Sequence, residues 1–165
     1  MSLPRLTRRT LVGGAAVAAL GVTTGAWILT RRAAGHSALS ERQLRTAAAL
    51  AETALAVPPN KATELADKFD AFIATEPIAR ATEAKQALLL LELGPLVLER
   101  ALTTFAGLDP DARERHFTEK WMTHESELRR QVSIGLLRFF QLVYFDDPDS
   151  WVEIGYPGPS LRVTP

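Results

Sequence analysis

The histidines are the side chains in this sequence best suited to metal chemistry, but their spacing does not favour a site. His116 and His124 lie eight residues apart in a segment of helical pattern. They would share a helix face about 12 Å apart along the axis, too far to bind one metal ion. Metal sites in helical bundles use Glu-x-x-His, which neither residue satisfies. We therefore expect no metal ligand here, and we expect both histidines to face solvent or a partner.

Other chemical motifs are scarce. Acidic and basic residues alternate through residues 113–130, which is typical of an exposed helix rather than of an acid–base pair. The sequence has no Gly-x-Gly-x-x-Gly, no phosphate loop and no Gly-x-Ser-x-Gly. It also has no cysteine, which excludes disulfides, iron–sulfur clusters, a thiol nucleophile and covalently attached c-type haem. We predict no catalytic residue and no cofactor.

The first 35 residues are typical of an export segment. Residues 1–10 are basic, residues 11–29 carry no charge, and Arg31-Arg32 follow. Within this segment Thr7, Arg8, Arg9 and Leu11 resemble the twin-arginine export motif. An ordinary uncleaved membrane anchor with basic flanks remains the alternative, because 19 apolar residues suffice to span a bilayer. Either way, we predict an exported protein, periplasmic or at the outer face of the cytoplasmic membrane.

Charge separates this segment from the rest. The 165 residues hold 19 basic and 19 acidic side chains, so the net charge is zero, which argues against a nucleic-acid binder. Residues 1–35 carry five arginines and no acid, a charge of +5, and residues 36–165 carry −5. A basic segment thus precedes an acidic domain.

Residues 36–165 have the periodicity of helices and lack strand signals. We predict an all-α fold, an irregular bundle of about five helices. Ser40 and Gln43 form a capping box for the first helix, and Asn60 caps the second. A third helix, 78–93, contains four leucines in a row and should be central; at Gly94-Pro95 it either kinks or gives way to another helix that Gly107 closes. The last two helices span 110–124 and 126–145, before Asp146-Asp147-Pro148.

Residues 146–165 form a Gly- and Pro-rich tail that we predict to be extended. Large apolar side chains within it, Trp151, Ile154 and Tyr156, lie among Gly155, Pro157, Gly158 and Pro159. Prolines favour an extended chain with little entropy left to lose, which suits docking in a groove. Two destinations remain open for this tail: a partner protein or the chain's own bundle.

The C-terminal half resembles the gluconate 2-dehydrogenase subunit 3 family, the small subunits of membrane-bound flavin dehydrogenases. The similarity covers mainly residues 100–159. It includes Phe105-Ala106-Gly107-Leu108, Arg113 with Trp121, Tyr144-Phe145, and the string from Ile154 to Pro159. Residues 36–99 are similar only in helical character. The twin-arginine-like start is also similar to that family.

This resemblance implies a non-catalytic accessory subunit. Its partner would be a large flavoprotein dehydrogenase subunit of the glucose–methanol–choline type, commonly with a cytochrome subunit, and it would carry the export signal and assist maturation. The residues expected to bind the partner are Trp121, Tyr144, Phe145, Trp151, Ile154, Gly155, Tyr156, Pro157, Gly158 and Pro159. Further partners would be the twin-arginine export machinery and, through residues 1–35, the membrane. Two other functions remain open: a membrane-anchored helical interaction protein unrelated to dehydrogenases, and an exported helical metal protein.

Overall fold

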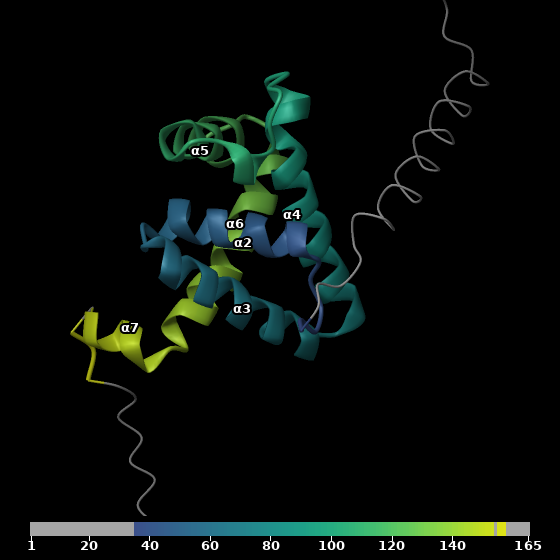
Figure 1. Ribbon diagram of the computed structural model, residues 1–165. Coiled ribbons are helices and arrows are strands. Elements are labelled where there is room, and N and C mark those ends of the chain that lie inside the picture. The colour runs from purple at the N-terminus through teal and green to yellow at the C-terminus, as the bar shows by residue number, and fades with distance from the viewer. Residues whose placement is uncertain (1–34, 154, 158–165) are drawn as a thin grey trace, which may run out of the picture. The chain divides into compact units, whose positions relative to one another are not determined.

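The computed structural model describes residues 35–153 and 155–157, which contain helices and no β-strand (Figure 1). This confirms the all-α prediction. A 3-10 turn (Phe105–Gly107) precedes the fourth of the α-helices, and a π-helical turn (Thr118–Met122) follows it. The α-helices are α2 (Glu41–Leu55), α3 (Pro59–Thr75), α4 (Ile78–Leu98), α5 (Pro110–Phe117), α6 (Glu127–Phe145) and α7 (Pro148–Glu153). In the described part of the chain no helix is both long and apolar enough to cross a membrane.

Side chains cap α2 and α5, whereas α3, α4 and α6 begin without a side-chain cap. The Ser40 hydroxyl accepts a hydrogen bond from the backbone N–H of Gln43, and the Gln43 side chain accepts one from Ser40, so the predicted capping box is present. Asp109 caps α5, because its side chain accepts a hydrogen bond from the Ala112 N–H. Asn60, predicted to cap the second helix, lies inside it, because α3 already begins at Pro59. A proline fits the first turn since that turn leaves its N–H positions unpaired anyway.

The Gly94-Pro95 pair does not divide α4. Pro95 lies inside this helix, which runs without a break to Leu98, so the alternative of two successive helices is wrong. The helix also ends well before Gly107. Although Leu88 and Leu91 are fully buried, Leu90 is 51% exposed. α4 therefore has one open side and is not the central helix that its leucines predicted.

The central position belongs to α2, which packs against α3, α4, α5 and α6. Its alanines allow these neighbours to approach closely, and Ala47, Leu50 and Ala51 are fully buried. A buried carboxylate fastens α4 to this centre: Glu92 accepts hydrogen bonds from the Thr46 hydroxyl at 2.9 Å and from the Ala106 N–H at 3.1 Å. Both hydrogen bonds reach Oε2, and they offset part of the cost of burying this side chain.

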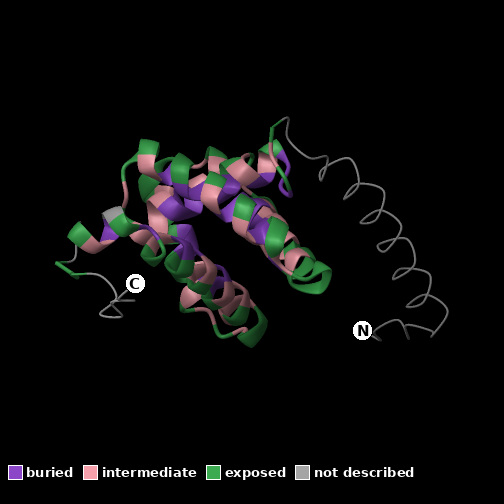
Figure 2. Ribbon diagram, turned by 90° about the horizontal axis from the view of Figure 1, so that it is seen from below, coloured by how far each residue is buried: buried purple, intermediate pink, exposed green. Residues whose placement is uncertain are grey.

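Aromatic rings join α3 to α6. Phe69 and Phe140 stack with ring centroids 4.7 Å apart, and Phe139 lies 6.2 Å from Phe69 at a tilt. Phe69 and Phe140 are fully buried. Figure 2 shows buried positions where the helices meet and exposed positions on their outer sides. Phe69 and Phe140 therefore belong to the core between these helices.

The start of the described chain is held by one carboxylate of α3. Asp70 is buried and accepts three backbone hydrogen bonds, from Ser37 at 2.7 Å, Ala38 at 2.9 Å and Leu39 at 2.6 Å. Burial raises the pKa of Asp70, but the three N–H donors outweigh this effect, so the pKa lies below its usual value. Residues 37–39 are thereby fixed to the bundle.

Replacing Asp70 with asparagine should destabilise the protein by about 2–3 kcal/mol, because charge-assisted hydrogen bonds to three backbone donors are lost. Urea unfolding would measure this change, and hydrogen exchange should accelerate at residues 37–39. Asp67→Asn is the matched control, since the Asp67 side chain is 56% exposed. Equal unfolding midpoints for the two variants would contradict the role given to Asp70.

Candidate functional site

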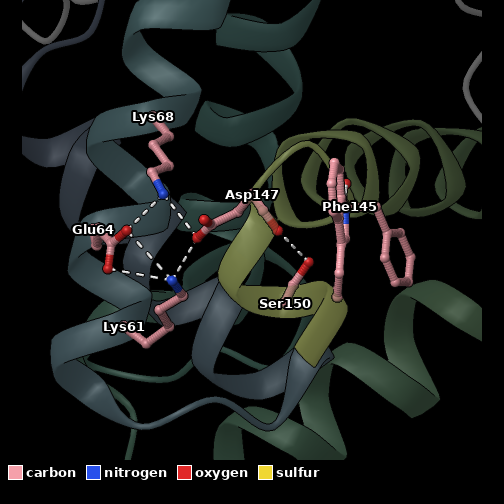
Figure 3. Close-up of polar contacts among 7 residues, drawn as sticks. Lys61, Glu64, Lys68, Phe145, Asp147 and Ser150 are labelled. Carbon is pink, nitrogen blue, oxygen red and sulfur yellow. Dashed lines mark hydrogen bonds and ion pairs between the residues drawn. The ribbon is translucent and has the colours of Figure 1, made fainter. Parts of the chain in front are cut away.

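The C-terminal segment that carries the predicted partner-binding residues is fastened to α3 by a cluster of charges (Figure 3). Asp147, which is buried, binds Lys61 Nζ at 2.6 Å and Lys68 Nζ at 2.8 Å through the same oxygen. Glu64 bridges the two lysines at 3.3 Å and 2.6 Å. The four charges alternate in sign and sum to zero, so the segment is held without a net charge.

The pKa shifts in this cluster all favour the charged forms. The hydrogen bond from Asp147 raises the pKa of Lys61 and also that of Lys68. The hydrogen bond from Lys68 lowers the pKa of Glu64. Since the lysines titrate well above neutrality and Glu64 well below it, the cluster persists throughout the physiological pH range.

Beyond Asp147 the chain forms a helical turn where an extended tail was predicted. α7 begins at Pro148 and ends at Glu153, and the Ser150 hydroxyl donates to the Asp147 carbonyl at 2.7 Å. The reason is local: an Asp-Pro pair starts α7 just as Asp109-Pro110 starts α5. Only Gly155, with φ of +69°, turns the chain out of this helix.

An exposed aromatic and aliphatic surface results, which we call the α6–α7 surface. It comprises Leu142 (54% exposed), Phe145 (48%), Val152 (81%) and Tyr156 (47%). Trp151 stiffens it, because its indole N–H donates to the Phe145 carbonyl at 2.6 Å and its ring meets Tyr156 edge-on at 5.8 Å. Side chains that are both apolar and fixed lose little entropy on binding a partner.

The structure places most of the predicted partner residues on or beside this surface. Tyr144 is half-buried and contacts Phe145 edge-on at 5.3 Å, while Gly155 and Pro157 are exposed. Ile154, Gly158 and Pro159 lie outside the described residues. The same holds for the export-signal residues Thr7, Arg8, Arg9 and Leu11.

Trp121 is a correction to the predicted set. Its side chain is only 4% exposed, and its indole N–H donates to His116 Nε2 at 3.1 Å. The pair lies so close to Gly94 that a Cβ there would stand 2.8 Å from His116 Nε2 and 3.1 Å from the Trp121 ring. This tryptophan fills the space between α4 and the π-helical turn, and it offers almost no area to a partner.

His116 corrects a second expectation, because it faces neither solvent nor a partner. It is 2% exposed, and its Nδ1 lies 2.9 Å from Glu99 Oε2. Since Nε2 accepts from Trp121, the ring is neutral and Nδ1 carries the proton that it donates to Glu99. Burial lowers the pKa of His116, and Lys120 and Arg129 act in the same direction, while Glu99 opposes them. His124 is half-buried, lies beyond the π-helical turn and accepts from the Ser126 N–H.

The alternating charges of 113–130 are not uniformly exposed either. Arg113 is 7% exposed; it binds Glu52 at 2.7 Å and donates to the Leu108 carbonyl at 3.1 Å. This pair joins α5 to α2. The periodicity of the sequence predicted the helix but not the burial of Arg113, because its partner Glu52 lies 61 residues away in the sequence.

Within residues 35–153 and 155–157 no cluster of three or more His, Asp or Glu side chains is arranged to hold a metal ion. The polar clusters around Asp147, His116 and Asp70 are ion pairs and hydrogen bonds that hold separate segments of the described chain together. What the geometry offers for function is a held apolar surface at the C-terminal end.

Comparison of the chain with family models, with curated proteins and with solved structures finds no match in any of the three.

Sequence reasoning missed Asp147 as the residue that positions the surface, treating Asp146-Asp147-Pro148 only as the end of a helix. The signal was present, because an aspartate before a proline is also a helix start. It missed Asp70 and Glu92 as well, and no local pattern marks them, since their partners are backbone groups and a hydroxyl more than ten residues away in the sequence.

The buried neutral His116 should make stability pH-dependent. Its folded pKa lies below the usual value of 6.5, so the unfolded chain binds the proton first as pH falls. The stabilisation is complete above pH 6.5 and is lost as pH falls from there through the folded pKa. Urea unfolding between pH 8 and 5 would measure the loss. His116→Leu should cost about 1–3 kcal/mol at pH 8, yet lose less stability on acidification.

His124→Ala serves as the control and should keep the pH dependence of the unchanged protein. Parallel stability profiles for His116→Leu and the unchanged protein would refute a buried neutral His116.

Proposed function

We propose that this chain is the non-catalytic small subunit of an exported flavin-dependent dehydrogenase complex of the glucose–methanol–choline type. It carries the export signal for the complex and assists maturation or assembly of the large flavoprotein subunit. The proposal is supported by the twin-arginine-like residues Arg8 and Arg9 and by the family resemblance of residues 100–159. The structural observation that carries it is the α6–α7 surface, which Asp147 holds in place.

The α6–α7 surface suits a protein partner. Phe145, Val152 and Tyr156 are large and about half or more exposed, and aromatic residues are enriched among those that dominate binding energy. Beside them lies a hollow of about 470 Å³ lined by Phe72, Leu142 and Pro148, among others. A protruding side chain of the large subunit would fill this hollow while the aromatic residues cover it.

In this proposal the two ends of the chain have separate tasks. Residues 1–35 address the twin-arginine machinery and contact the membrane, and the complex works in the periplasm or at the outer face of the cytoplasmic membrane, commonly with a cytochrome subunit. The chain itself binds no cofactor and carries no catalytic residue. Flavin and substrate belong to the large subunit.

Charged substitutions in the α6–α7 surface should release the partner. Val152→Asp with Tyr156→Asp should weaken binding to the co-expressed large subunit at least about tenfold, because buried carboxylates would replace apolar contacts. Co-purification followed by titration would measure this. Ile78→Asp is the matched control, since Ile78 is 86% exposed on α4. Undiminished binding by the double variant would count against the surface.

The carrier role has its own test. Arg8→Lys with Arg9→Lys should leave both subunits in the cytoplasm. Arg31→Lys with Arg32→Lys preserves the charge in the same way, and both subunits should still be exported. Fractionation with dehydrogenase activity as the readout would show the difference. Export of an active large subunit in the absence of residues 1–35 would sink the carrier role.

A further inference from the structure

A second surface of the protein is a long groove between α4 and α6. Two adjoining hollows of about 480 Å³ and about 230 Å³ form it, and both are lined by Leu128 and Val132. We call it the α4–α6 groove. Its other principal residues are Glu83, Ala87, Leu90 and Val97 of α4, and Gly135 and Phe139 of α6.

The groove has the length and spacing of a helix-binding site. Along α4 its residues recur at intervals of three, four or seven, which places them on one face of the helix. From Glu83 to Val97 the face extends about 21 Å, or about four turns of helix. Side chains of a third helix can enter such a groove as ridges enter grooves between packed helices.

The residues along its edges are apolar and exposed. Leu90, Val97 and Leu128 are 51%, 73% and 67% exposed, and they come from both helices. An exposed apolar area formed by two elements together differs from the scattered apolar residues of an ordinary surface. Covering it would remove these side chains from water.

Gly135 indicates that something approaches the floor of the groove closely. It lies in the middle of α6, where glycine destabilises a helix relative to alanine. A Cβ on Gly135 would meet no atom within 4 Å, so the described fold gives no steric reason for a glycine there. The missing side chain leaves room for another backbone.

The two ends of the groove carry opposite charges. Glu83 stands at the end near Phe139, and Arg129 at the end near Val97. Neither forms an ion pair within the described residues. A ligand that matches these charges has a basic group opposite Glu83 and an acidic group opposite Arg129. This charge order also fixes the direction in which the ligand lies.

We propose that the α4–α6 groove binds an amphipathic helix of another polypeptide. That helix has apolar residues at i, i+3, i+4 and i+7, a Lys or Arg opposite Glu83 and an Asp or Glu opposite Arg129. A second copy related by a two-fold axis would place its own groove opposite this one, and neither copy would then supply side chains to fill the groove of the other. The inference does not depend on the proposed function, because any polypeptide with such a helix satisfies it.

Photocrosslinking in the cells that produce the full-length chain would identify the occupant. A benzophenone amino acid in place of Leu128 should capture one dominant peptide of another protein, with the stated apolar spacing and charge order. The same amino acid in place of Arg45, whose side chain is 61% exposed on α2, is the control. A peptide from a second copy of this chain, a peptide lacking that pattern, or a yield no higher than at Arg45 would overturn the proposal.

Variants inside the groove complete the test. Gly135→Trp fills the floor and should lower the crosslink yield at least fivefold, while its melting temperature stays within a few degrees of that of Gly135→Ala. Glu83→Lys with Arg129→Glu should lower the yield similarly without touching the core, and it keeps the test valid if Gly135→Trp fails to fold. An unchanged yield in the charge-reversal variant would overturn the proposal.

Discussion

The structure depends on the charged residues of a single helix, α3. Asp70 gathers the backbone N–H groups of residues 37–39, and Lys61 and Lys68 together hold Asp147 at the far end of the described chain. Between these charged positions the same helix supplies Phe69 to the core. Because each buried carboxylate has several donors, its burial is compensated, and removing a donor would leave an unsatisfied charge. Residues 37–39 and Asp147, near the two ends of the described chain, are thus anchored to one helix.

A second polar cluster uses a neutral group instead of a charge. His116 links Glu99 to Trp121, and the ring is held against Gly94 with no room for a further methyl group. This fixes the π-helical turn to the C-terminal end of α4. Trp121 also lines the α4–α6 groove, so the buried histidine shapes a surface that it does not itself reach.

The two apolar surfaces differ in how they are built. The α6–α7 surface combines the end of α6 with the short α7, and both the Asp147 ion pairs and the hydrogen bond from Trp151 to the Phe145 carbonyl hold α7 in place. The α4–α6 groove is formed by two long helices of the bundle and requires no such anchor. A small domain that leaves this much apolar area uncovered on two sides is suited to a larger assembly.

The sequence by itself determined that the fold is all-α and that Ser40 and Gln43 form a capping box, because these follow from local spacing and from hydrogen bonds between near neighbours. Only the tertiary structure decided that Trp121 and His116 are buried, that α2 rather than α4 is central, and that residues 148–153 form a helix fixed by Asp147. The physical reason is the sequence separation between the residues that interact. Periodicity tells which face of a helix is apolar, but burial of a polar side chain depends on partners brought close by folding, such as Lys61, which lies 86 residues from Asp147.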